Sequence, residues 1–154
     1  MPGQNLTRLE AAERSATVRT QSYDVVLDLT RGETVFGSTT TARFTATPGS
    51  STFIDLVAPT VRSITLNGTP LDPAEVYADS RIALKDLAAD NELVVVAYCA
   101  YMHTGEGLHR FTDPADGETY LYSQFEVPDS RRVFAVFEQP DLKASFTFTV
   151  TAPS

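Results

Sequence analysis

From Tyr23 onward, apolar side chains recur at every second position over most short runs of this chain. That period is typical of β-strands with one face turned to a core. In the first run Tyr23, Val25, Leu27 and Leu29 fall on one face. Further strands are predicted at residues 34–47, 52–56, 61–66, 93–98, 120–127 and 146–150. Short strands separated by turn signals predict an all-β fold, an antiparallel β-sandwich.

Turn residues and a single helix complete the predicted fold. Asn67-Gly68 is the strongest hairpin signal in the chain, and it follows the run 61–66. The run 93–98 is apolar on both faces, which predicts a central strand. Before the first strand, Thr7 to Glu10 form a capping-box pattern followed by good helix formers, so one short amphipathic helix is expected near residues 7–15.

The run 120–127 has two contrasting faces. Leu121, Phe125 and Val127 fall on a face that suits a hydrophobic interior. The opposite face carries Tyr120, Tyr122, Gln124 and Glu126. Aromatic faces are common on exposed strands, so this face is either an ordinary polar surface with half-buried tyrosines or a surface that binds a ligand.

Two regions depart from the strand pattern. Residues 105–111 contain Gly105 and Gly107 and predict a loop with a constrained backbone, and residues 113–117 predict a turn. After Pro128 ends the strand, Asp129 or Ser130 is expected to cap a helical turn. The mixture of charged and large apolar side chains from there to residue 143 predicts a surface that bridges to another body, with a salt-bridged surface turn as the alternative.

Size and charge narrow the functional classes. The 154 residues predict one domain, 1–154, of ordinary soluble composition. A net charge of -8 argues against nucleic acid and tolerates a cationic ligand such as a free amino terminus. No apolar run is long enough for a membrane helix, and the first five residues show no export signal. The single cysteine, Cys99, permits no internal disulfide, so a cytoplasmic location is expected.

No self-contained active site is visible in the sequence. The two histidines, His103 and His109, belong to no zinc-binding pattern. We expect His109 to be a structural hydrogen-bonding residue and Cys99 to be a buried, inert thiol. The chain has no nucleophile elbow or phosphate-binding glycine loop. By itself, therefore, it is expected to catalyse nothing and to bind no metal or other cofactor.

Three ordered motifs resemble a known family. They are the segments 107–111, 120–126 and 131–146, supported by residues 5–8 and 53–61. Together they resemble the amino-terminal domain of bacterial aminopeptidase N, in the zinc-dependent M1 family of gluzincin aminopeptidases, over essentially the whole chain. The resemblance implies a saddle-like β-sandwich packed on a catalytic domain of the same polypeptide, which holds the zinc and the exopeptidase motif.

The same resemblance implies roles for residues of this chain. The family's Gln-x-Glu motif carries over onto Gln124 and Glu126, with Glu126 holding the α-ammonium of a peptide substrate and Gln124 lining the first side-chain pocket. Tyr122 lies on the same face and is a candidate for the pocket rim. The family's Phe-Pro-Cys-Phe-Asp-Glu-Pro pattern is replaced here by residues 134–140, which leaves the turn geometry open.

Physical chemistry supports an amine anchor independently. A charged amine distinguishes the end of a peptide from its interior, and a fixed carboxylate can recognise it through a charge-assisted hydrogen bond. Two other functions stay open: a stand-alone β-sandwich module that binds peptides or sugars, and a non-catalytic scaffold of the same fold. If the domain is separated from a larger enzyme, Phe134, Val136 and Phe137 are expected to form an exposed apolar patch.

Overall fold

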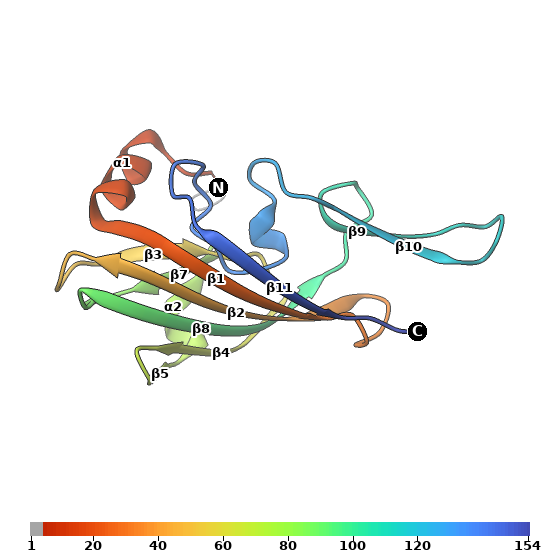
Figure 1. The fold of residues 1–154 in the computed structure, drawn as a ribbon, viewed down its shortest axis with the longest axis horizontal. Coiled ribbons are helices and arrows are strands. Elements are labelled where there is room, and N and C mark those ends of the chain that lie inside the picture. The colour runs from red at the N-terminus through yellow and green to blue at the C-terminus, as the bar shows by residue number, and fades with distance from the viewer. Residues whose placement is uncertain (1–4) are drawn as a thin grey trace.

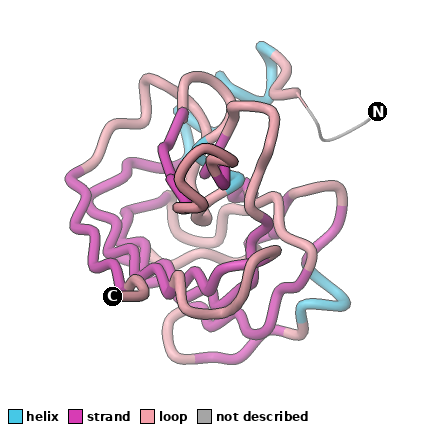
Figure 2. Tube along the Cα trace, turned by 90° about the vertical axis from the view of Figure 1, so that its right-hand side faces the viewer, coloured by secondary structure: helices cyan, strands magenta, loops and turns pink. Residues whose placement is uncertain are grey.

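A computed structural model describes residues 5–154 as a mostly β domain with one short N-terminal helix (Figure 1). Residues 1–4, which belong to the segment searched for an export signal, lie outside the described part. The strands form a sheet of order β11-β1-β2-β8-β4-β5, a smaller sheet of order β3-β7-β6 and a separate ribbon of β10 and β9. Viewed after a turn of 90°, the strands curve around the interior of the domain (Figure 2).

Helix α1, Arg8–Thr17, begins where the capping-box pattern predicts. The Glu10 N–H donates to the Thr7 hydroxyl at 3.2 Å, and the Thr7 N–H donates to the Glu10 carboxylate at 2.9 Å. These two bonds satisfy amide groups that the first helical turn leaves free. The predicted helix is therefore confirmed.

The large sheet is built on three long strands: β1 (Val18–Asp28), β2 (Val35–Ala46) and β8 (Asp90–Ala100). In β2 and β8, and in β1 from Tyr23 onward, alternate residues are buried, as a half-covered strand requires. Strand β8 lies between β2 and β4, so the predicted central position of the run 93–98 is confirmed.

The shorter strands complete the two sheets. Strands β4 (Thr60–Leu66) and β5 (Thr69–Leu71) form a hairpin in which Asn67 and Gly68 have φ of 51° and 81°, and both positive values suit a type I′ turn. The small sheet consists of β3 (Thr52–Asp55), β6 (Tyr77–Ala78) and β7 (Arg81–Leu84). A four-residue helix, α2 (Pro73–Val76), precedes β6.

The segment 133–137, here called the strap, is buried within the core and includes Phe134, Val136 and Phe137. Phe134 is only 2% exposed, and the Phe137 ring meets Phe44 edge-on at 5.1 Å. Val136 pairs with Asp55 of β3 through two backbone hydrogen bonds. The expected exposed patch at these residues is therefore wrong, as is the bridging role for this part of the segment, because these side chains fill the domain's own interior.

Strand β11 (Ser145–Thr151) makes the fold mixed rather than wholly antiparallel, because it pairs in parallel with β1 at the sheet edge. Between β10 and β11 the chain passes through the 3₁₀ helix η1 (Ser130–Arg132) and the strap. This long connection returns the chain to the end at which β1 begins, and a parallel pair requires such a crossover. Every residue of β11 is exposed in this chain.

Strands β9 (Gly107–Thr112) and β10 (Thr119–Gln124) pair with each other in a separate ribbon that projects beyond the sheets, away from α1 (Figure 1), and β9 also forms an isolated bridge to Met102. The prediction of a loop at residues 105–111 is wrong from Gly107 onward, where the chain is strand. The predicted turn at residues 113–117 is present at the tip, where the Gly117 N–H donates to the Asp113 carbonyl at 2.7 Å.

Candidate functional site

The ribbon presents the predicted binding face to solvent. Tyr122 is paired across the ribbon with His109, and Gln124 with Gly107. Directly paired residues of two antiparallel strands share a face. Tyr122 and Gln124 therefore lie on one face with His109, and all six residues of β10 are exposed.

His109 fixes the conformation of this face. Its ring stacks on the Tyr122 ring at 4.6 Å with an angle of 24° between the planes. The Gly105 N–H donates to His109 Nδ1 at 3.1 Å, so in the neutral ring the proton is on Nε2. These contacts agree with the structural role expected for His109, and they fix Tyr122 on the ribbon.

Glu126 lies in a turn directly after β10, two residues beyond the last strand residue, Gln124. The Asp129 N–H donates to the Phe125 carbonyl at 3.3 Å and closes this turn. Glu126 is exposed, and among residues 5–154 its carboxylate has no hydrogen-bond or ion-pair partner. A free, outward-facing carboxylate is what an external cation requires.

The apolar face predicted for residues 121–127 is only partly correct. Leu121 is 38% exposed and Val127 is 58% exposed, because the projecting ribbon and the turn after it have no second layer over them. Phe125 alone turns inward, where its ring meets Phe134 edge-on at 5.6 Å. That contact fixes the turn on the side that precedes Glu126.

The base of the ribbon packs closely on η1. Gly107 has φ of +65°, and a Cβ on it would lie 3.0 Å from the Cβ of Arg132. Only glycine allows both this backbone conformation and this approach without strain. Arg132 Nε in turn donates to the Asp129 carboxylate at 2.9 Å. The start of β9, which pairs with Gln124 of β10, and the end of the turn that contains Glu126 are thus both held against η1.

Nothing in the described part of the chain forms a metal site. No group of three or more histidine, cysteine, aspartate or glutamate side chains is placed to hold an ion within residues 5–154. The rings of His103 and His109 lie 6.4 Å apart, and Nδ1 of each already has a partner within the protein. The Cys99 thiol is fully buried, which raises its pKa to about 12 and agrees with the inert role expected for it.

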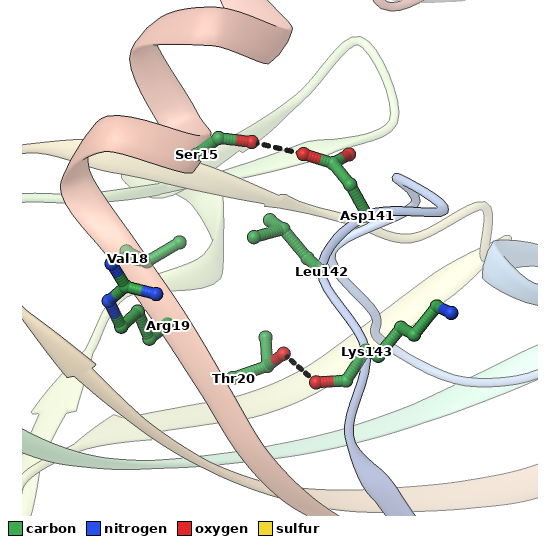
Figure 3. Close-up of a pocket in the computed structure, with 7 residues that line it drawn as sticks. All are labelled: Ser15, Val18, Arg19, Thr20, Asp141, Leu142 and Lys143. Carbon is green, nitrogen blue, oxygen red and sulfur yellow. Dashed lines mark hydrogen bonds between the residues drawn. The ribbon is translucent and has the colours of Figure 1, made fainter.

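A pocket that does not include Glu126 lies between the start of β1 and the loop before β11 (Figure 3). Its volume is about 400 Å³, and it is lined by Ser15, Val18, Arg19, Thr20, Asp141, Leu142 and Lys143. The Ser15 hydroxyl donates to Asp141 at 2.5 Å, and the Thr20 hydroxyl donates to the Lys143 carbonyl at 2.6 Å. Both bonds join α1 and β1 to the same loop, so these groups stabilise the fold and favour no ligand.

Comparison with known proteins identifies the family. The sequence model of the Peptidase M1 N-terminal domain matches residues 19–154. The chain belongs to this family. The aminopeptidase N of Streptomyces lividans is 60% identical over 157 residues, which cover 99% of this chain and 18% of that protein. The chain therefore spans less than a fifth of this curated relative.

Solved structures show the same fold in proteins of low sequence identity. Aminopeptidase A of Legionella pneumophila, in complex with aspartic acid, has a TM-score of 0.72 and 17% identity, covering 87% of this chain and 16% of that one. Leukotriene A4 hydrolase of Saccharomyces cerevisiae has a TM-score of 0.70 and 16% identity, covering 96% of this chain and 28% of that one. The M1 resemblance of the sequence is confirmed by the family model and by the 60% identical relative.

Within residues 5–154 no helix has the length and apolar character needed to cross a membrane.

A buried polar network that the sequence pattern does not predict joins α1 to the residues after the strap. Arg14, on the exposed-looking helix α1, is 1% exposed and pairs with Asp55 at 2.8 Å. Glu138, just after the strap, donates its backbone N–H to the same Asp55 carboxylate at 3.1 Å. No periodic pattern marks these charged residues as internal. The altered family pattern at 134–140 includes two members of this network, Glu138 and Gln139, but it is altered at Ala135 and Val136 as well and so does not single the network out.

Proposed function

We propose that this chain is the amine-binding domain of a zinc-dependent M1 aminopeptidase, which releases amino-terminal residues from peptides. Glu126 binds the substrate's α-ammonium, Gln124 lines the first side-chain pocket and Tyr122 lies at its rim. The observation that supports this most strongly is the Glu126 carboxylate itself, exposed and unpartnered among the described residues, in a turn fixed on both sides. The relative's name supplies the peptidase class.

The zinc chemistry belongs, in this proposal, to a catalytic domain of the same polypeptide. The described residues of this chain do not fit a zinc site, since none of their histidine, cysteine and carboxylate side chains gather in threes. When bound in the full-length enzyme, zinc would activate the attacking water. The residues of this domain would bind and orient the peptide end, and the isolated chain would be inactive.

The exposed aromatic side chains of β11 and the ribbon suggest where the rest of the polypeptide packs. Phe146 and Phe148 stack at 6.0 Å on one face of β11, and both are exposed in this chain. Exposed apolar patches of this kind mark interaction surfaces. In this proposal they form the interaction surface that the sequence assigned to Phe134, Val136 and Phe137, which the structure buries.

We place the protein in the cytoplasm because its single cysteine is a free thiol.

The test is a substitution in the full-length enzyme. Glu126→Ala should lower kcat/KM for an aminoacyl anilide by roughly 10- to 150-fold, the value of one charge-assisted hydrogen bond. Hydrolysis of the same acyl anilide without its α-amine should not change, and neither should the bound zinc. The matched control is Glu118→Ala, another exposed carboxylate of the ribbon region. An unchanged kcat/KM for Glu126→Ala would contradict the proposal.

Two outcomes would favour the other functions. A full-length protein that folds but neither binds zinc nor cleaves peptides would be a non-catalytic scaffold. Peptide or sugar binding by the 154-residue chain alone, measured by calorimetry and unaffected by Glu126→Ala, would indicate a stand-alone binding module.

A further inference from the structure

The exposed turn that contains Glu126 is fixed at two points. On one side Phe125 packs its ring on Phe134. On the other side, the Pro128 carbonyl accepts a hydrogen bond from Arg131 Nε at 3.0 Å. Glu126 and Val127 lie between these points and are both exposed. The orientation of the Glu126 carboxylate therefore depends on where Arg131 is held.

Arg131 is held by the half-buried carboxylate of Glu138. Glu138 Oε2 accepts the Arg131 N–H at 2.9 Å and also accepts the Ser130 hydroxyl. The Arg131 carbonyl accepts the Val57 N–H at 2.8 Å. Both backbone groups of Arg131 are thus bound by parts of the sandwich, and η1 has no freedom to move without breaking these contacts.

Glu138 is in turn connected to the domain's buried ion pair. Its N–H donates to Asp55 Oδ2, the same oxygen that accepts from Arg14 Nη1. Arg14 is clamped further by Gln139, whose Oε1 accepts from Arg14 Nε at 3.0 Å, and by the face of the Phe53 ring at 4.6 Å. A contiguous set of hydrogen bonds therefore extends from α1, through the residues after the strap, to the turn of the candidate site.

Burial makes the Glu138 carboxylate costly to ionise, and burial raises its pKa, whereas the bonds from Ser130 and Arg131 oppose this rise. Both hydrogen bonds that this carboxylate accepts come from η1, the element next to the turn. Binding sites are most effective when the residues that contact the ligand are held by a second set of fixed hydrogen bonds.

We propose that Glu138 is a positioning residue for substrate binding: through Ser130 and Arg131 it fixes the Pro128 carbonyl, and so the direction in which Glu126 meets the α-ammonium. This inference rests on the proposed function of Glu126. Glu138 does not touch the substrate, so its effect must pass through Glu126.

The experiment is a double-mutant cycle in the full-length enzyme. The measured quantity is the amine selectivity, kcat/KM for an aminoacyl anilide divided by kcat/KM for the same anilide without the α-amine. Glu138→Ala should lower this ratio by about 3- to 30-fold, within the range of coupled neighbouring sites. Adding it to Glu126→Ala should lower the ratio no further, because the group it positions is gone. A merely destabilised enzyme would lose both rates equally and keep the ratio.

Isosteric and distant variants keep the test decisive. Glu138→Gln retains one acceptor oxygen and the side-chain volume, so it should fold and show a smaller loss of selectivity in the same direction. Glu92→Ala, which removes an exposed carboxylate paired with Arg43 at 3.2 Å, should leave the ratio unchanged.

The outcomes separate the two proposals. If Glu126→Ala lowers the amine selectivity but Glu138→Ala and Glu138→Gln leave it within about twofold of the wild type, the positioning role is wrong and the anchor stands. An equal loss from Glu138→Ala with and without Glu126 would also overturn it. If Glu126→Ala itself leaves the ratio unchanged, both proposals fail.

Discussion

The sandwich and the ribbon are built on opposite principles. In the sandwich, alternate side chains of β1, β2 and β8 are buried, and even charged groups such as Arg14 and Asp55 are enclosed with partners. In the ribbon, every residue of β10 is exposed and the strand has a single neighbour, β9. Stability is thus concentrated in one region and candidate binding groups in the other, with η1 between them. Substitutions in the two regions should differ sharply.

The largest effect is expected in the core, at Phe137. Phe137→Ala removes a ring that is 2% exposed and packed edge-on against Phe44, so the free energy of unfolding should fall by about 3–5 kcal/mol. Urea unfolding measures this loss. Phe148→Ala is the control on β11, where the ring is 45% exposed, and should cost less than half as much. Equal losses would show that β11 is as well packed as the interior.

The next effect concerns the buried ion pair. Asp55→Ala leaves the Arg14 guanidinium enclosed without its carboxylate and should lower the free energy of unfolding by about 3 kcal/mol. Asp24→Ala breaks the exposed pair with Arg43, joined at 2.7 Å, and should cost less than about 1 kcal/mol. Similar values for the two variants would contradict the contrast between enclosed and exposed charges.

A smaller effect should appear as a pH dependence at the start of α1. Hydrogen bonding by Arg81 lowers the pKa of Glu10 to about 2 from its ordinary value of 4.5. The unfolded chain therefore binds the proton more readily, so this stabilisation is complete above pH 4.5 and is lost as the pH falls toward 2. The contribution should be about 0.5 kcal/mol after allowance for solvent screening.

Glu10→Gln provides the measurement for this pH effect. Its urea midpoint should change less between pH 4.5 and pH 2 than that of the parent chain. Glu13→Gln, on the same helix, is the control and should leave the pH dependence as it is. An identical pH profile for Glu10→Gln and the parent would exclude a contribution from the Arg81 contact.

An effect on stability as small as that of Glu10 is expected in the ribbon itself. Tyr122→Ala removes the stacking contact with His109 at 4.6 Å, yet it should change the free energy of unfolding by only about 0.5 kcal/mol, because the ribbon contributes little to the core. In the full-length enzyme the same change should raise KM if Tyr122 lies at the pocket rim. A loss of stability comparable to that of Phe137→Ala would show that the ribbon folds as part of the sandwich.

The period-two pattern and the turn residues were sufficient for most of the fold. The helix start at Thr7, the hairpin at Asn67-Gly68 and the central position of β8 are all present as predicted. These features depend on local geometry, which a sequence expresses directly. The parallel pairing of β11 was not predicted, since strand direction depends on the path of the whole connection before it.

The candidate site residues were predicted from the sequence, but the burial of the side chains around them was not. The motif resemblance supplied Gln124 and Glu126, and alternation placed Tyr122 and Gln124 on one face. Burial was misjudged in both directions: Val127 is exposed, whereas Phe134 is enclosed. An apolar side chain at strand period is buried only if another layer covers it, and neighbours distant in sequence provide that layer.

The amino-acid sequence by itself therefore determined most of the longer strands, the hairpin turn, the helix cap and the family, because each depends on short-range patterns or ordered motifs. Only the tertiary structure decided which faces are covered, and that Arg14, Asp55 and Glu138 meet behind the turn of Glu126. A charged side chain can be buried only if the fold brings a partner to it from far along the chain. Buried charges therefore show no periodic pattern in the sequence.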